Sequence, residues 1–343
     1  MAKIRIFSDI FTIFASWRNK TFTIIRRVLK IFWLVIVAIT ATILAISLAL
    51  QTPAVQTRIA DKVVKTVNEK LDGEISFERI HFKPFTSLVL KNVVIIDKQP
   101  VIDPVAPESS PVDTFFRASY IVAKMNLKSL TGREGIHIDK VIITDADMNL
   151  VLEDNPGEGK NSTDNLSRIF RIEKEQKKEP GDKELFHIQR VELDGFDFSM
   201  KNYTSSKTPY YGGINWNNLD IRDIQLKAKE IRFKGGVMSG EVNSLSFSEK
   251  SGYTCNLIKG KAKVGNGKAI IEDFSLNDPW SSINLPLYMM SYSGVEAFQD
   301  YIAEVKMDAE FSQSIVDFRT ITYFAPQLEG NELIVNVKKG TFS

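Results

Sequence analysis

Few residues of this 343-residue chain belong to the types that usually do chemistry in proteins. The chain has three histidines and a single cysteine, Cys255, which therefore has no disulfide partner within the chain. His137 and His187 stand at the same polar position of two similar apolar motifs, which predicts surface residues rather than a metal pair or a catalytic base. His81 flanks a predicted strand and adds no ligand spacing. We expect no metal site.

The sequence motifs of nucleophilic, metal-dependent and phosphate chemistry are absent. There is no G-x-S-x-G, H-E-x-x-H or Walker loop, and the segment 265–269 predicts a hairpin turn. The carboxylate pairs Asp145 with Asp147 and Asp194 with Asp197 fall at predicted turns and on polar faces, away from any sugar-binding or phosphate-binding pattern. We therefore expect a protein that is not an enzyme and that needs no cofactor.

The charge of the chain is distributed unevenly. The net charge is +2, yet residues 1–30 carry seven cations against one carboxylate, and residues 31–50 carry no charge. An apolar run of about 20 residues spans the hydrocarbon core of a bilayer as a helix. The positive-inside rule then places residues 1–30 in the cytoplasm and the remaining chain across the membrane. The expected anchor residues include Ile31, Phe32, Trp33, Leu34, Leu44 and Leu50.

The charge pattern leaves one alternative to the anchor open and argues against one class of partner. A cleaved signal peptide ending near residues 47–49 is the alternative to an anchor, although its apolar region would be shorter, about 7–15 residues. The chain beyond residue 50 is mildly acidic, which gives no electrostatic footprint for nucleic acid.

An amphipathic helix is predicted for residues 51–73. Thr52 and Pro53 form a typical helix start, apolar residues recur every fourth position between Val55 and Leu71, and Gly73 ends the pattern. The apolar stripe of this helix must be covered by the segment that follows.

After Gly73 the hydrophobic period stays close to two for about 220 residues, which is typical of antiparallel strands with one apolar and one polar face. The predicted β-domain is residues 74–343. A pattern of apolar, any, apolar, any, any, apolar recurs, which predicts a degenerate β-repeat. Because its last apolar residue is out of phase with the first two, we expect a bulge within the pattern. The copies are 75–80, 136–141, 186–191, 219–224 and 269–274.

Two inserts interrupt this β-rich region. Residues 98–113 contain four prolines and are not expected to continue a sheet, and residues 154–184 predict a short helix over 165–172 with a charged loop. Short helices are also predicted at 294–301 and 314–324. The strand-like segment 333–337 is followed by no closing turn, so we expect an N-terminal piece of a longer protein.

The predicted fold is therefore mainly β: a long, coiled antiparallel sheet that forms an open hydrophobic groove. A sheet with one apolar face must bury that face against a second sheet, against helices or against an external partner. An open trough suits acyl chains, whose transfer through water costs about 0.8 kcal/mol per methylene. The candidate groove residues are Phe196, Phe198, Met200, Ile224, Leu226, Leu245 and Phe247.

Several segments carry a resemblance to a known family. They are 52–56, 73–77, 87–95, 165–170, 213–221, 245–252 and 324–328. In order and pattern, residues 20–343 resemble the N-terminal part of the AsmA-like proteins, and among them the TamB family, the inner-membrane subunit of the translocation and assembly module.

The resemblance implies a bridge-like lipid transporter of the bacterial inner membrane, with the bulk of the chain in the periplasm. Its groove would conduct phospholipid toward the outer membrane and support outer-membrane biogenesis. An Omp85-family barrel is the implied partner, through a C-terminal region that this sequence lacks. The alternative hypothesis is an anchored scaffold for outer-membrane protein assembly or secretion, whose apolar face is an ordinary core.

Overall fold

The computed structural model describes residues 52–83, 87–101, 112–124, 136–154, 162–171, 184–204, 210, 212–293, 305–324 and 339–342. The chain divides into a unit Met1–Gln56 and a unit Thr57–Ser343, and the second contains the whole described sheet. The predicted cytoplasmic segment 1–30 and membrane span 31–50 lie outside the described residues. Among those that are described, no helix combines the length and the hydrophobicity that crossing a membrane requires.

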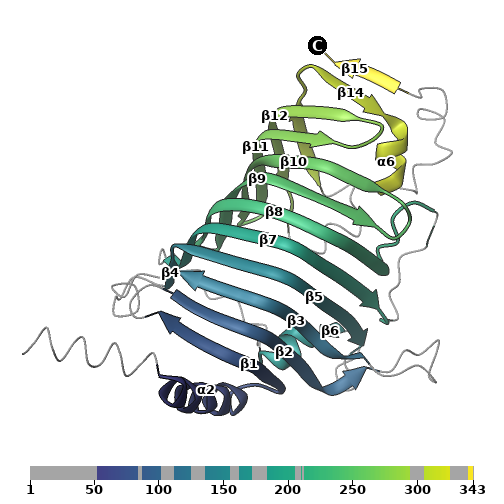
Figure 1. Ribbon diagram of the computed structural model, residues 1–343. Helices are drawn as coiled ribbons and strands as arrows, with labels where there is room; N and C mark the ends of the chain where they lie inside the picture. The colour runs from purple at the N-terminus through teal and green to yellow at the C-terminus, as the bar shows by residue number, and fades with distance from the viewer. Residues whose placement is uncertain are drawn as a thin grey trace, which may run out of the picture. The chain divides into compact units, whose positions relative to one another are not determined.

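Strands dominate the described chain (Figure 1). The helices are α2 (Pro53–Asn68), α4 (Asn165–Ile169) and α6 (Phe318–Phe324). The strands are β1 (Gly73–Lys83), β2 (Ser87–Val101), β3 (Val112–Lys124), β4 (Ile136–Ile138), β5 (Lys140–Asp154), β6 (Ser162–Asp164), β7 (Glu184–Asn202), β8 (Asn218–Lys234), β9 (Val237–Glu249), β10 (Thr254–Gly265), β11 (Lys268–Asn277), β12 (Ser282–Ser291), β13 (Lys306–Glu310), β14 (Ser314–Asp317) and β15 (Lys339–Phe342).

One open sheet contains all 15 described strands, in the order β1-β2-β3-β5-β7-β8-β9-β10-β11-β12-β14-β15. Three short strands lie off this path, where β4 pairs with β7, β6 with β5 and β13 with β12. The expectation of a mainly β protein built on one long sheet is confirmed. The hairpin turn predicted at 265–269 is confirmed as well, with Asn266 and Gly267 at positive φ between β10 and β11.

The sheet is not antiparallel throughout, which corrects the prediction. β5 and β4 both pair with β7 in parallel. A parallel pair needs a connection that returns the chain to the same end of the sheet. The segment between β5 and β7, with β6 and α4, makes this return. The motif copies at 136–141 and 186–191 therefore lie side by side in register, Ile136 opposite Phe186.

The helix predicted over 51–73 is present as α2 but ends at Asn68. The side chain of Asn68 bonds both backbone groups of Ile75 in β1, accepting from its N–H at 2.7 Å and donating to its carbonyl at 3.1 Å. This amide takes the place of a neighbouring strand at the edge of the sheet. A Cβ at Gly73 would lie 2.7 Å from Ile169 Cγ2, so the reversal before β1 requires glycine.

Two other boundaries differ from the prediction. β2 continues through Pro100 to Val101, which pairs with Val112, so the proline-rich insert is shorter than 98–113. Residues 314–317 form β14 rather than helix because they pair with β15, and only α6 is helical. The short helix in the second insert is confirmed as α4, whereas the segments 294–301 and 333–337 lie outside the described residues.

Extra residues in the strands keep the apolar side chains on one face. In β1, Phe77 and Ile80 are three positions apart, yet Phe77 packs in one cluster with Leu90, the cross-strand partner of Ile80, so both lie on the same face. In five strands a residue at such an irregularity has a positive φ. These residues are Asn92 in β2, Asp145 in β5, Gly195 in β7, Asp223 in β8 and Asp273 in β11. These residue types tolerate the left-handed conformation.

The irregularity expected within the repeated motif is thereby confirmed at several copies. In copies 219–224 and 269–274 the left-handed residue is the fifth residue of the copy, Asp223 or Asp273. Copies 75–80 and 186–191 instead face a left-handed residue of the next strand, Asn92 or Glu230.

The left-handed conformation at Asp223 can be tested by substitution. We expect Asp223→Val to lower the free energy of unfolding by about 1–3 kcal/mol relative to Asp223→Gly, because a β-branched side chain is strained at positive φ. Urea unfolding followed by tryptophan fluorescence measures the difference. Equal stability of the two variants would contradict the assigned backbone conformation.

Candidate functional site: the apolar face of the sheet

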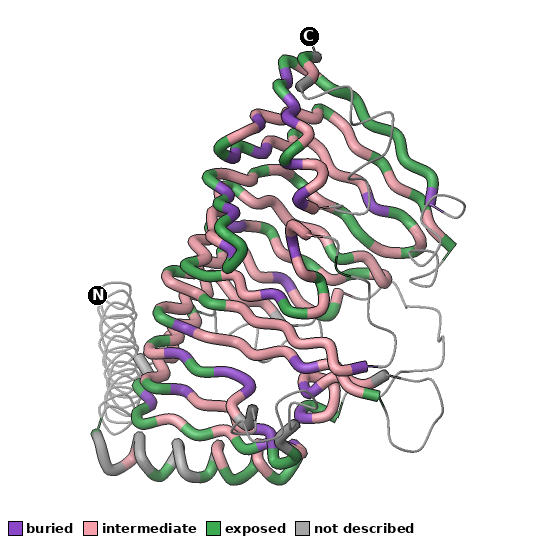
Figure 2. The backbone as a smooth tube through the Cα atoms, turned by 90° about the vertical axis from the view of Figure 1, so that its right-hand side faces the viewer, coloured by how far each residue is buried: buried purple, intermediate pink, exposed green. Residues whose placement is uncertain are grey.

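The seven candidate groove residues lie on one face of the sheet. Phe196 is the cross-strand partner of Ile224, and Leu226 is the partner of Leu245. Opposite residues project to the same side of a sheet, and even spacing along β7 and β9 adds the other three candidates to that side. All seven are half-buried. Figure 2 shows that half-buried residues extend along most of the strands.

A continuous row of leucines and isoleucines crosses this face. Each member is the direct cross-strand partner of the next, over ten strands from β1 to β12. At about 4.8 Å per strand, the row extends about 43 Å. Its members, which we call the aliphatic row, are Ile80, Leu90, Ile121, Ile143, Leu193, Leu226, Leu245, Ile258, Leu276 and Ile283.

The opposite face of the sheet carries the charges. Lys229 pairs with Glu241 at 2.9 Å between β8 and β9, and Lys140 pairs with Glu192 at 2.7 Å between β5 and β7. Such partly exposed surface pairs contribute about 0–1 kcal/mol each. They matter here for their location, because these charges lie on the face opposite the aliphatic row.

Helix α4 covers the apolar face near β2, β3 and β5. Its Ile169 is fully buried against Val93, Phe115 and Ala118. The side chain of Asn165 accepts from Val151 N–H at 3.0 Å and donates to the Asn149 carbonyl at 2.9 Å, which docks the helix on the backbone of β5.

Arg168 of α4 forms ion pairs with two carboxylates. It lies 2.5 Å from Asp97 of β2, which is only 3% exposed, and it also pairs with Glu153 of β5. The buried Asp97 carboxylate is thereby compensated, as a buried charge requires.

Helix α6 covers a second part of the same face. Tyr323 stacks on Tyr253 with ring centroids 4.3 Å apart, and Phe324 meets Tyr253 edge-on at 5.2 Å. Phe198, Met200 and Phe247 pack against this aromatic cluster. These three candidates are therefore already in contact with protein, whereas Phe196 packs against the α4 cluster.

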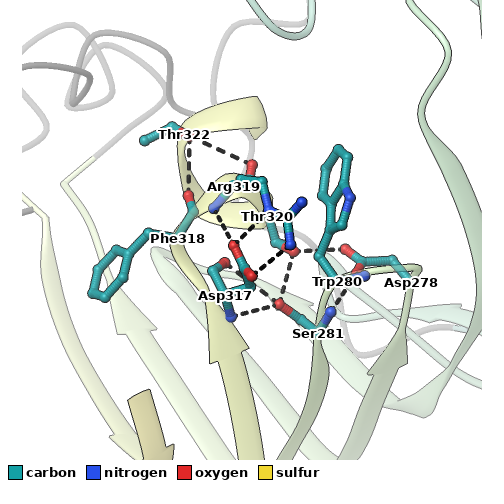
Figure 3. A network of polar contacts seen from close by, with 8 residues as sticks. All are labelled: Asp278, Trp280, Ser281, Asp317, Phe318, Arg319, Thr320 and Thr322. Atoms are coloured by element: carbon teal, nitrogen blue, oxygen red, sulfur yellow. Dashed lines mark hydrogen bonds and ion pairs between the residues drawn. The ribbon is translucent and has the colours of Figure 1, made fainter. Parts of the chain in front are cut away.

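A buried polar network fastens α6 to the connection between β11 and β12 (Figure 3). The Asp278 carboxylate accepts from Ser281 N–H at 2.6 Å and from the Thr320 hydroxyl at 2.8 Å. The Ser281 hydroxyl in turn accepts from Asp317 N–H at 2.9 Å. A carboxylate that is 5% exposed is stable here because neighbouring N–H and O–H groups satisfy it.

The connections β9–β10 and β7–β8 also bond to α6. Glu249 accepts from the Tyr323 hydroxyl and from Ser251 N–H, both at 2.8 Å. Ile214 N–H donates to the Tyr323 carbonyl at 2.9 Å. The helix therefore fastens three successive hairpin connections at one margin of the sheet.

This environment shifts several pKa values. Burial raises the pKa of the Cys255 thiol to about 11, and it raises the pKa of Tyr253 and of Tyr323 well above the usual value. Burial also acts to raise the pKa of Glu249, but hydrogen bonds from Ser251 and Tyr323 outweigh it and hold that pKa below 4.5. None of these groups is set up as a nucleophile, since a high pKa keeps the thiol and phenols protonated.

The central part of the aliphatic row is in neither cluster. Leu193, Leu226 and Leu245 are half-buried, and neither they nor Ile224 belong to the sets packed under α4 or α6. Of the predicted groove residues, Ile224, Leu226 and Leu245 are thus the ones that pack in neither described cluster.

His187 is not the surface residue that the sequence predicts. His187 is 8% exposed, and its Nδ1 lies 3.1 Å from Nδ1 of His137 because the parallel pairing places the two residues side by side. Nε2 of His187 lies 3.1 Å from Glu230, and the Gln189 amide lies 3.2 Å from His137 Nε2. These contacts join β4, β7 and β8 on the polar face.

The carboxylate pairs lie within strands rather than at turns. Asp145 and Asp147 belong to β5, and Asp194 and Asp197 to β7. Among the described residues, no group of three or more potential ligands could hold a metal ion.

Sequence reasoning missed the residues that fasten α6. Glu249, Asp278 and Tyr323 are far apart in the sequence and belong to no shared motif. The only local signals are two acidic residues at strand ends: Glu249 is the last residue of β9, and Asp278 directly follows β11. Acidic residues are common at the ends of hairpins.

Comparison with known proteins leaves the resemblance as a prediction: no protein-family model and no curated protein matches the chain.

The pKa of Glu249 makes the attachment of α6 dependent on pH. Because its folded pKa lies below the usual 4.5, Glu249 stabilises the fold above that value and loses its contribution as the pH falls. We expect the free energy of unfolding to decrease between about pH 5 and about pH 3, and to decrease less in Glu249→Gln. Chemical unfolding at a series of pH values measures this. Glu74→Gln, at an exposed position, is the control, and an unchanged slope in Glu249→Gln would refute the assignment.

Proposed function

We propose that this chain is an AsmA-like protein of the TamB kind, anchored in the bacterial inner membrane with its N-terminus in the cytoplasm. Its periplasmic β-sheet conducts phospholipids along an apolar groove toward the outer membrane, and it makes and breaks no covalent bond. An Omp85-family barrel is the proposed partner. The charge asymmetry of residues 1–50 supports the anchor and its orientation.

The aliphatic row carries the proposal. It runs for about 43 Å, and no second sheet lies over it among the described residues. Leu90, Ile121, Ile143 and Ile258 pack in the helix-covered clusters, whereas Leu193, Leu226, Leu245 and Ile283 belong to neither cluster. An acyl chain of about 14 carbons that leaves a bilayer for water loses on the order of 11 kcal/mol. Contact with a continuous apolar face removes most of this barrier at each step of the path.

Site-specific photo-crosslinking at two adjacent residues tests the proposal. A photoreactive amino acid at Leu226 would lie on the apolar face, and the same group at Lys227 would lie on the polar face. We expect phospholipid adducts from Leu226 and none from Lys227 in the membrane-anchored protein, identified by mass spectrometry. Crosslinks from Leu226 only to other parts of the chain would contradict a lipid-conducting face.

The packing under α6 favours a second candidate function. Phe198, Met200 and Phe247 are in contact with the Tyr253–Tyr323 cluster, as core residues of a scaffold are. In this alternative the chain is an anchored periplasmic scaffold for outer-membrane protein assembly or secretion, and it conducts no lipid.

Stability measurements separate the two functions. A lipid-facing position tolerates a charge in the absence of lipid, whereas a packed position does not. We expect Phe198→Asp to cost about 3 kcal/mol or more and Leu226→Asp to cost about 1 kcal/mol, as measured by urea unfolding. Equal, large losses at both positions would favour the scaffold.

A further inference from the structure

Parallel pairing brings two of the three histidines of the chain together on the polar face of the sheet. His137 of β4 and His187 of β7 are cross-strand partners, and their Nδ1 atoms lie 3.1 Å apart. The ring centroids are 4.5 Å apart and the ring planes are inclined at 74°, so the rings meet at their Nδ1 edges and do not stack. The third histidine, His81, is exposed in β1.

The outer nitrogen of each ring is held by a neighbouring side chain. Nε2 of His187 lies 3.1 Å from Oε2 of Glu230, and Nε2 of His137 lies 3.2 Å from the side-chain amide of Gln189. An ionised carboxylate only accepts, so the Nε2–H of His187 donates to Glu230 and its Nδ1 keeps a lone pair. The amide oxygen of Gln189 can accept from His137 in the same way. Metal-binding histidines have this arrangement, with the second ring N–H bonded to a carboxylate or carbonyl oxygen.

The separation of the two Nδ1 atoms fits one ion that is bound by both. With metal–nitrogen bonds of about 2.0–2.1 Å, a distance of 3.1 Å between the nitrogens corresponds to an angle of about 100° at the ion. This angle lies between the value of about 90° in square-planar sites and of about 109° in tetrahedral sites. Two lone pairs that face each other at this distance repel, so a cation must lie between them, either a metal ion or a shared proton.

The charges around the two rings favour a cation. Glu230 lies beside one ring, and Asp139 Oδ1 lies 3.8 Å from Nε2 of the other. Arg232 of β8 is the cross-strand partner of His187, and it is itself paired with Glu230 and with Glu184. In this set of contacts three carboxylates stand against one guanidinium. Their net negative charge lowers the free energy of an ion bound between the rings.

We propose that the Nδ1 atoms of His137 and His187 form an open site for one divalent transition-metal ion, Zn²⁺ or Cu²⁺, both of which suit imidazole ligands. The site has two protein ligands rather than three or more. The His137 side chain is 33% exposed and the His187 side chain 10% exposed, so water reaches the ion from one side and supplies the remaining ligands.

The bound ion would fasten a short strand to the sheet. β4 has only three residues, and its described strand partner is β7, so a metal bridge between these two strands adds to a small number of backbone hydrogen bonds. The site lies on the polar face, opposite the aliphatic row. It therefore goes beyond the proposed function and does not depend on it.

Metal titration tests the site. The full chain in detergent, freed of metal and carrying no polyhistidine tag, would be titrated with zinc chloride or copper chloride in a calorimeter, and we expect one bound ion per chain. His137→Gln and His187→Gln should each weaken binding about a hundredfold, because each removes one of two nitrogen ligands. Glu230→Gln should weaken it about tenfold, because it disturbs only the support of His187. His81→Gln is the matched control and should bind as the wild type does.

Spectroscopy of the wild type keeps the test independent of whether a variant folds. Electron paramagnetic resonance of the Cu²⁺ complex should show hyperfine coupling to two imidazole nitrogens. Zinc should also raise the urea midpoint of the wild type and of His81→Gln, since an ion that binds the folded state stabilises it.

Three results would overturn the site. They are unchanged affinity in His137→Gln or His187→Gln, a Cu²⁺ spectrum without two coupled imidazole nitrogens, and a wild type that binds neither ion. The last result would show that the two Nδ1 atoms share only a proton. Lipid crosslinking at Leu226 is a separate measurement on the opposite face, so either proposal can fail while the other stands.

Discussion

The structure depends on one constraint: each strand must return its apolar side chains to the same face after every extra residue. Side-chain direction alternates along a strand, so a single added residue would otherwise send the rest of the strand to the polar side. Asn92, Asp145 and Gly195 absorb this residue in a left-handed conformation. The aliphatic row is continuous because neighbouring strands accommodate their added residues at matching positions.

The resulting apolar face is covered by helices at two places along its length and is half-exposed elsewhere. Where α4 and α6 lie, buried carboxylates such as Asp97 and Asp278 are compensated by an arginine or by several N–H and O–H donors, and the side chains beneath are packed. Between and beyond the helices the same face is half-exposed. Half-exposed aliphatic side chains in a continuous array are characteristic of a surface that meets another apolar material. The fold thus combines fixed attachment at one margin with an accessible face elsewhere.

Local sequence patterns predicted much of this architecture. Period-two alternation indicated strands with one apolar face, and the odd spacing within the repeated motif indicated irregularities where Asp223 and Asp273 lie. The parallel pairing of β5 with β7 was not predictable in this way, because these two strands keep one apolar and one polar face as the antiparallel strands do. The burial of His187 follows from that pairing and was missed for the same reason.

By itself the sequence determined the strand content, the helix start at Pro53, the hairpin at Asn266–Gly267 and the scarcity of catalytic groups, since these follow from local periodicity, turn chemistry and residue type. Only the tertiary structure decided the strand order, the row that joins ten strands and the attachment of α6 to Glu249 and Asp278. Those features depend on pairings between residues far apart in the chain. Their energies come from contacts that no local pattern encodes.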